Sequence, residues 1–354
     1  MSQKTRPRGN LNPSFSLQTV LTDSITGLLL ALVVFPSLTA LAVSTMFGRF
    51  KAAGMDLQLR RHCLPSSDVH TDFRLDYTGI GAIDKTLCPL VTFFHNIMDN
   101  PTSSSFLSYA IGISGPMITL PLLEAYRLGQ SRFVLYPVVW GLLSQIATVG
   151  MVFPLYWLAF ILTEGAKVQR TYKVHSFTQA EAEAIIFGIV VGAVIPSLAM
   201  LFMADAHVTA IWQLYPLYIS IAQLVHMFIR PPSKHSQSGI VTIRALYLGL
   251  FIVSSSMHIS TVWPLINDFS AIKELLLPSS SAIHPSKDIN NHLLEFLKWD
   301  VIIAYSATAL AMLWFSKNVK QLITILLWYA VAIPVFGFGA AVMGVAIWRD
   351  GILN

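Results

Sequence analysis

The sequence is poor in charged residues. Only 12% of its 354 residues are Asp, Glu, Lys or Arg, whereas 54% are hydrophobic. Soluble globular domains carry about 25% charged and about 45–50% apolar residues. Because the deficit is spread along the whole sequence, it favours many membrane-spanning segments over a single anchor. The composition therefore predicts a polytopic membrane protein in contact with the lipid bilayer.

The sequence also lacks the motifs of several large enzyme classes. It contains no Walker loop, no GxGxxG after a strand, no HExxH, no paired CxxC and no GxSxG. These absences argue against nucleotide hydrolysis, dinucleotide redox chemistry, a metal site and a serine nucleophile. The net charge is +5, but no dense basic stripe with interleaved aromatic residues is present. We therefore expect no metal, no cofactor and no nucleic-acid partner.

Cysteine is nearly absent as well. The two cysteines, Cys63 and Cys88, both lie in the region between the first two predicted spans. Two thiols are too few for a thiolate metal site within the chain. A disulfide between them is compatible with a lumenal loop, and two unpaired thiols are an equal alternative.

The long apolar runs predict an all-α transmembrane bundle of about eight spanning helices. A span needs about 20 mostly apolar residues to cross roughly 30 Å of hydrocarbon. The predicted spans are 24–47, 103–123, 133–163, 178–203, 208–229, 240–263, 297–315 and 322–348. We treat 24–348 as a single transmembrane domain with polar loops at about 48–86 and 264–292. A polar N-terminal tail, 1–23, precedes it, and a C-terminal tail, 349–354, follows it.

Local signals refine this outline. The apolar run at 87–98 is too short to span and predicts a re-entrant or interfacial helix. Gly150 and Pro154 predict a kink in the third span, and Thr178 with Glu181 forms the pattern of a capping box at the start of the fourth. An even number of spans places both termini on one side. Basic residues are nearly balanced between the two sides, so the orientation stays open.

Two carboxylates stand at the ends of predicted spans. A charged group within the hydrocarbon is costly, so each is a functional candidate. Glu124 ends the second span, where Arg127 lies three residues further on and offers an interfacial ion pair as the alternative. Asp300 begins the seventh span, where a carboxylate favoured by the helix dipole is the alternative.

His95 and Asp99 form a second candidate pair. They are four residues apart, so they share one face of a helix and are able to relay a proton. The alternative is that Asp99 or Asn100 caps the next helix, which begins with Pro101.

The sequence holds 21 Phe, 11 Tyr and 8 Trp. Many of these rings will form interfacial belts or simply pack. Rings that line a cavity stabilise a carbocation by about 0.5–2 kcal/mol per contact. Our candidates for such substrate-binding rings are Tyr156, Trp157, Tyr218 and Trp314.

Three segments carry a resemblance to a known family: LDYTGIGAIDKTLCPLVTFFHNIMD, PLLEAYRLG and KWDVIIAYS. They resemble the fungal integral-membrane terpene cyclases of the larger, roughly eight-span type. These enzymes belong to indole-diterpene and meroterpenoid pathways, and the aflavinine- and ascofuranone-type cyclases are among them. The resemblance covers most of the chain in the layout of its spans.

The resemblance implies a reaction. Such enzymes protonate an epoxide on a prenylated aromatic or indole substrate, after which alkenes attack the cation in sequence, and they act as isomerases or lyases. The sequence has neither the DDxxD run of metal-dependent cyclases nor the DxDD motif of soluble ones. A carboxylic acid in an apolar site therefore remains as the acid, because desolvation keeps it protonated. We assign this role to Glu124 or Asp300, with Asp99 and His95 as the next pair.

The resemblance also implies a location in the endoplasmic reticulum and a pathway prenyltransferase and epoxidase as partners. Three other functions stay open at this point. An epoxide hydrolase would open the same protonated epoxide with water. A transporter for hydrophobic metabolites is disfavoured by the absence of an internal repeat. A non-catalytic membrane scaffold is the third.

Overall fold

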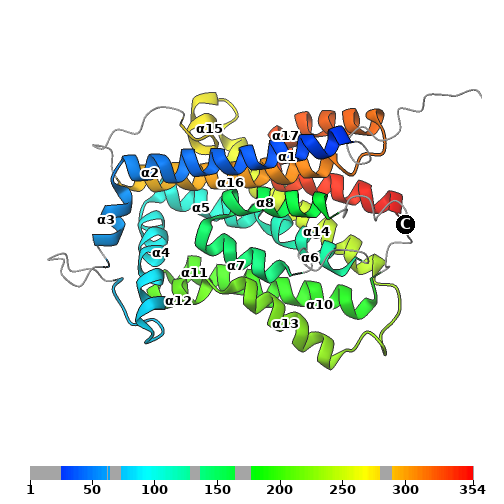
Figure 1. Cartoon of the computed structure of the whole chain (residues 1–354), viewed down its shortest axis with the longest axis horizontal. Coiled ribbons are helices and arrows are strands. Elements are labelled where there is room, and N and C mark those ends of the chain that lie inside the picture. Colours follow the sequence, from blue (N-terminus) through cyan, green and yellow to red (C-terminus); the bar gives the residue numbers. More distant parts are fainter. Residues whose placement is uncertain are drawn as a thin grey trace, which may run out of the picture.

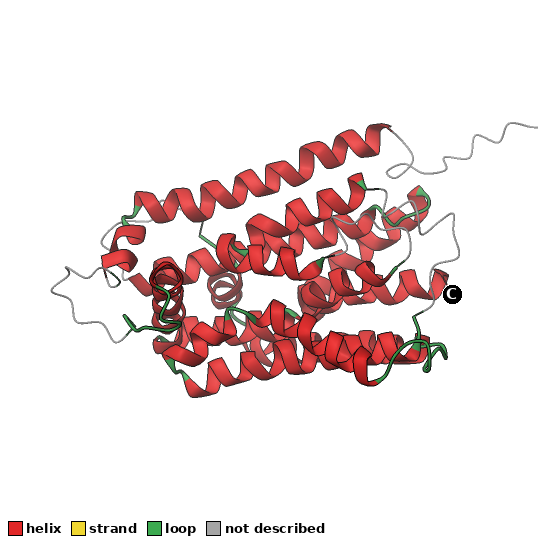
Figure 2. Ribbon diagram, turned by 60° about the horizontal axis from the view of Figure 1, so that its bottom comes forward, coloured by secondary structure: helices red, strands yellow, loops and turns green. Residues whose placement is uncertain are grey.

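The computed structural model describes residues 25–61, 63, 73–127, 136–163, 177–279 and 289–353, so the predicted tail 1–23 lies outside the described residues. The described parts contain helices and loops but no strand (Figure 2). Most helices run along the long axis of the bundle (Figure 1). The elements of the first half are α1 (Ile25–Ala42), η1 (Val43–Gly48), α2 (Arg49–Ala52), α3 (Met55–Arg61), α4 (Gly81–Asp99), α5 (Pro101–Ile113), α6 (Gly115–Tyr126), α7 (Pro137–Ala147) and α8 (Val149–Leu162). Those of the second half are α10 (Gln179–Ile189), η2 (Val190–Val194), α11 (Ile195–Met203), α12 (Ala206–Trp212), α13 (Tyr215–Ile229), α14 (Ile240–Val262), η3 (Trp263–Leu265), α15 (Phe269–Leu276), α16 (Ile289–Leu313) and α17 (Val319–Leu353).

The helices are those of a polytopic membrane protein, as predicted. Six are long and apolar enough to cross a membrane, and the bent pair α12 and α13, with 62° between its axes, makes a seventh if it counts as one span. The six are Ile25–Ala52, Pro101–Tyr126, Gln179–Met203, Ile240–Leu265, Ile289–Leu313 and Val319–Gly351. The expected number of about eight is therefore not confirmed.

The predicted span 133–163 differs most from expectation, because it is two short helices that fold back on each other. The chain turns at Thr148, whose φ is 74°. The rings of Trp140 and Tyr156, eight residues before and after this turn, lie 5.5 Å apart edge to face. This contact requires α7 and α8 to be antiparallel. We call them the α7–α8 hairpin.

A second fold-back lies inside α17, within the predicted span 322–348. Gly337 has a φ of 84°, outside the helical region. The indole N–H of Trp328 donates to the carbonyl oxygen of Ala341 at 2.8 Å. Thirteen residues of straight helix would separate these groups by about 20 Å. The two halves of α17, orange and red in Figure 1, therefore lie side by side.

Burial is uneven across the bundle. α1 buries Ala31 and Phe35 but exposes leucines on its other faces, as expected for a helix that faces lipid. α16 is buried along nearly its whole length and packs against α8. The contacts between Gly150 and Asp300 and between Trp157 and Thr308 show that α8 and α16 run parallel. The hairpin is thus inserted against the central helix.

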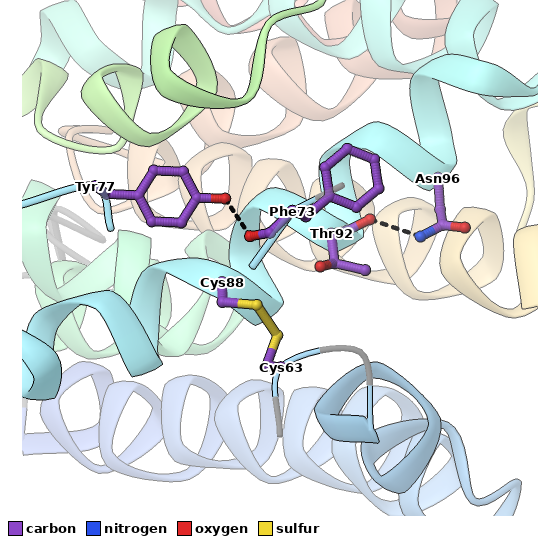
Figure 3. The surroundings of a disulfide bond; sticks show 6 residues. All are labelled: Cys63, Phe73, Tyr77, Cys88, Thr92 and Asn96. Atoms are coloured by element: carbon purple, nitrogen blue, oxygen red, sulfur yellow. Dashed lines mark hydrogen bonds between the residues drawn. A yellow bond between two sulfur atoms is a disulfide. The ribbon is translucent and has the colours of Figure 1, made fainter. Parts of the chain in front are cut away.

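α4 lies crosswise at one end of the bundle (Figure 1). It contains the apolar run 87–98 but begins six residues earlier, at Gly81. In its first turn, the carboxylate of Asp84 accepts hydrogen bonds from the backbone and the side chain of Thr78. Cys63 and Cys88 form a disulfide that joins the segment after α3 to α4 (Figure 3). The alternative of two unpaired thiols is thereby excluded.

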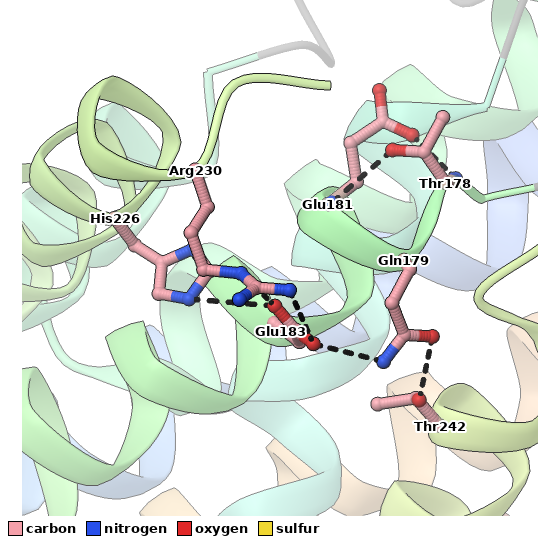
Figure 4. A network of polar contacts seen from close by, with 7 residues as sticks. All are labelled: Thr178, Gln179, Glu181, Glu183, His226, Arg230 and Thr242. Carbon is pink, nitrogen blue, oxygen red and sulfur yellow. Dashed lines mark hydrogen bonds and ion pairs between the residues drawn. The ribbon is translucent and has the colours of Figure 1, made fainter. Parts of the chain in front are cut away.

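Polar contacts at the start of α10 join three helices (Figure 4). The predicted capping box is confirmed, because Thr178 and Glu181 exchange hydrogen bonds between side chain and backbone. Glu183 pairs at 2.8 Å with Arg230, the residue that follows α13, and Gln179 accepts a hydrogen bond from Thr242 of α14 at 3.0 Å. This network holds α10, α13 and α14 together at the end of the bundle opposite α4.

Candidate functional site

A cavity of about 340 Å³ lies between α4 and the tip of the α7–α8 hairpin. Its size is at the lower end of the range of roughly 300–1,000 Å³ for small-molecule sites. Residues from η1, α2 to α8, α11, α12, α13 and α16 line it, most of them apolar. Among the described residues that line it, Asp300 is the only one with a charged side chain.

Asp300 reaches the cavity from the buried helix α16. The backbone N–H of Gly150 donates to its Oδ1 at 2.6 Å. Gly150 belongs to the first turn of α8, so the carboxyl group faces the N-terminus of a helix, where negative charge is favoured. A Cβ atom at Gly150 would lie 2.8 Å from the carbonyl oxygen of Asp300 and 2.9 Å from Oδ1, so only glycine permits this approach. The tip of the hairpin therefore holds Asp300 in place.

Aromatic rings cover two walls of the cavity. On the hairpin, Trp140, Phe153 and Tyr156 line it, and the Trp140 and Tyr156 rings meet edge to face. On the opposite side Phe94 of α4 meets Trp212 of α12 with ring centroids 4.9 Å apart. The ring faces are electron-rich, so such walls attract a cation.

Glu124 does not line this cavity. It is buried in an ion cluster with Arg127, Arg349 and Asp350, at the end of the bundle where the chain ends. Arg349 lies 2.8 Å and Arg127 3.5 Å from its Oε1, and Arg127 also pairs with Asp350 at 2.7 Å. The expected pair of Glu124 and Arg127 is present, but it is part of a larger cluster that ties α6 to the second half of α17.

His95 and Asp99 also lie outside the cavity. His95 is buried, its Nε2 is 3.2 Å from the hydroxyl of Thr209, and its ring packs against Phe73 at 4.6 Å. Burial lowers the pKa of His95, which favours the neutral imidazole. Asp99 is exposed at the end of α4, and the cap of α5 is Asn100.

Of the four aromatic candidates, only Tyr156 lines the cavity. Trp157 points away and donates to Thr308 at 3.0 Å. The indole N–H of Trp314 donates to the carbonyl oxygen of Gly27 at 3.3 Å. The hydroxyl of Tyr218 donates to the carbonyl oxygen of Ile211 at 3.1 Å. These three side chains make hydrogen bonds between separate elements of the bundle.

Several polar residues of the cavity wall carry no signal in the sequence. Thr148, Gln145 and Gln213 line it, but isolated polar residues in apolar runs resemble ordinary packing positions. They become recognisable only once the turn at Thr148 and the bend between α12 and α13 bring them to one cavity.

Comparison with known proteins shows the family of this chain. The CtvD-domain family model matches residues 30–354, nearly the whole chain. The chain belongs to the CtvD-domain family. Two curated fungal relatives are similar to it. Terpene cyclase ascI of Acremonium egyptiacum is 26% identical over 70% of this chain and 69% of its own length. Terpene cyclase janA of Penicillium janthinellum is 23% identical over 79% of this chain and 83% of its own length. No solved structure matches.

Proposed function

We propose that this chain is a membrane-embedded terpene cyclase that protonates an epoxide on a prenylated aromatic or indole substrate, with Asp300 as the acid. The names of the two relatives support a terpene cyclase. The observation that carries the finer assignment is the position of Asp300, the one charged side chain among the described residues that line an apolar, aromatic cavity.

The reaction is written with this chain's own groups. The protonated carboxyl of Asp300 donates its proton to the epoxide oxygen, and the C–O bond at the more substituted carbon breaks. Alkenes then attack the cation in sequence, forming C–C bonds. Loss of a proton from the last cation gives an isomer of the substrate, and return of a proton to the Asp300 carboxylate restores the acid. Water must be kept out until then, and the apolar lining serves this purpose.

The hairpin supports this role of Asp300. Proton transfer leaves a carboxylate, and the N–H of Gly150 together with the N-terminus of α8 stabilises negative charge at that point. The groups are already in position, so no reorganisation is needed. Trp140, Phe153 and Tyr156 line the same part of the hairpin and would face the cation.

Glu124 fits a structural role better. Two guanidinium groups lie within 3.5 Å of its Oε1, so its carboxyl group is engaged in ion pairs and does not face a ligand cavity. His95 lies outside the cavity, and burial lowers its pKa, which favours the neutral imidazole. We therefore propose Asp300 alone as the acid and assign Glu124 to the packing of α6 against α17.

The disulfide supports a location in the endoplasmic reticulum. Disulfides persist in its lumen and are rare in the cytosol. Cys63 and Cys88 lie at the α4 end of the bundle, whereas α1 begins and the chain ends at the opposite end (Figure 1). The α4 end would then face the lumen, and the start of α1 and the end of α17 would face the cytosol.

The test is to incubate membranes that contain the protein with the epoxides of farnesyl-phenol and geranylgeranyl-indole. A new product of unchanged mass supports a cyclase, because cyclisation by proton transfer adds and removes nothing. A product heavier by one water indicates an epoxide hydrolase. No product from either substrate would overturn the proposal in favour of a transporter or scaffold.

A further inference from the structure

Gln213 stands at the bend between α12 and α13. It caps the C-terminus of α12, and its backbone N–H donates to the carbonyl oxygen of Ala210. Its side chain is 3% exposed and lines the cavity described above. The bend of 62° places this residue inside the bundle, although it belongs to a connection between helices.

Both polar atoms of the Gln213 side chain lack a hydrogen-bond partner among the described residues. A buried amide without partners is costly, and native proteins nearly always satisfy such groups. Gln179 shows the ordinary case, because its nitrogen donates to Glu183 and its oxygen accepts from Thr242. The amide of Gln213 therefore has a donor group and an acceptor group that no described residue uses.

The surroundings of Gln213 offer a ligand little else for hydrogen bonding. The neighbouring indole N–H of Trp212 is already used by the hydroxyl of Ser197 at 2.9 Å. The ring of Trp212 packs against Phe94 and stacks on Tyr215 at 5.7 Å. An aromatic ligand is thus able to pack on these faces while its polar group meets the amide.

The other unpartnered polar group of the cavity belongs to the α7–α8 hairpin. Tyr156 lines the cavity, and its hydroxyl has no hydrogen-bond partner among the described residues. Thr148 is two residues from Gly150, which holds Asp300. Among the described lining residues, the polar groups without a partner thus lie on two separate elements, the α7–α8 hairpin and the bend at Gln213.

We propose that Gln213 binds the polar head group of the substrate, an aromatic ring that bears a hydroxyl group. A phenol satisfies both amide atoms, since its O–H donates to Oε1 and its oxygen accepts from Nε2. An indole N–H would satisfy Oε1 alone. This inference rests on the proposed function, in which the prenyl chain of the same ligand extends to Asp300. It assigns selection of the head group to one residue and protonation to another.

The test measures binding without reaction. Farnesyl-phenol without an epoxide and farnesyl-benzene, which lacks only the hydroxyl, are titrated into the purified protein. We expect the wild type to bind the phenol roughly tenfold more tightly. Gln213→Leu should lose this preference and bind farnesyl-benzene as the wild type does, which also shows that the variant is folded. Gln223→Leu is the matched control, because Gln223 is a buried glutamine of α13 that does not line the cavity.

Two results would overturn the inference. One is a wild type that does not prefer the phenol, and the other is a Gln213→Leu variant that keeps the preference. Neither readout needs an epoxide or Asp300. A protein that binds the phenol through Gln213 but does not convert its epoxide would refute the proposed cyclase and leave the head-group site standing. A protein that cyclises the epoxide but fails the binding test would refute the head-group site and leave the proposed cyclase standing.

Discussion

The carboxyl groups of Asp300 and Glu124 are both buried in the bundle, but their surroundings are opposite. Asp300 lines an apolar cavity and accepts a hydrogen bond from Gly150. Glu124 lies outside the cavity and contacts two guanidinium groups. A carboxyl group that lines a cavity without a cation nearby is able to give a proton to a substrate, whereas one between two arginines is occupied by ion pairs. Burial alone therefore does not identify an acid, and the neighbouring charges decide.

The largest expected effect is that of Asp300→Asn. The amide still accepts the hydrogen bond from Gly150 but has no acidic proton, so cyclisation should fall by about 10²–10⁴-fold or more. Product formation from an epoxidised substrate is the measurement, and an unchanged thermal midpoint is the control. An active Asp300→Asn variant would remove the main contrast between the two carboxylates.

Glu124→Gln should affect stability instead. The change leaves Arg127 and Arg349 with one carboxylate, that of Asp350, and breaking a buried ion pair costs about 3–5 kcal/mol. We expect a lower thermal midpoint, with turnover per folded molecule retained. Loss of turnover at an unchanged midpoint would instead make Glu124 a candidate acid.

Gly150→Ala tests whether the hairpin positions Asp300. The new methyl group would lie within 3 Å of the carbonyl oxygen and Oδ1 of Asp300, so one of them must move. A displacement of about 1 Å at a reacting group costs on the order of 10² in rate. The matched control is Gly249→Ala in α14, where the added methyl group meets nothing within 4 Å. Equal activity of the two variants would show that the contact at Gly150 does not matter for the reaction.

The sequence predicts the helical class and most long segments well, because apolar runs of span length have few other solutions. It also predicts the capping box at Thr178, where a local pattern determines a local structure. The hairpins could not be predicted in this way. Threonine is not a residue that favours positive φ, and the turn at Thr148 lies inside a continuous apolar stretch. Gly337 is one of several glycines in its segment, so its turn carries no distinct signal.

The site shows the same limit. Asp300 was recognisable because a carboxylate in an apolar helix is rare. Its partner Gly150 is 150 residues away, and the two meet only because the chain folds back at Thr148. Gln213 has no local feature that distinguishes it from Gln223. Cavity walls built from many separate elements depend on tertiary packing, which the spacing of residues does not encode.

The smallest expected effect concerns His95, which with Asp99 forms the second candidate pair for proton transfer. Burial lowers its pKa below the usual value of 6.5, so the folded protein binds the proton less readily than the unfolded chain. Stability from this residue is therefore present above pH 6.5 and is lost as the pH falls below it, until the pKa of the folded state is passed. His95→Gln should flatten the dependence of the thermal midpoint on pH in this range and leave cyclisation at pH 7 unchanged. If the variant instead lost turnover while its midpoint stayed the same, His95 would have to be placed in the proton path, and Asp300 could no longer be the sole acid.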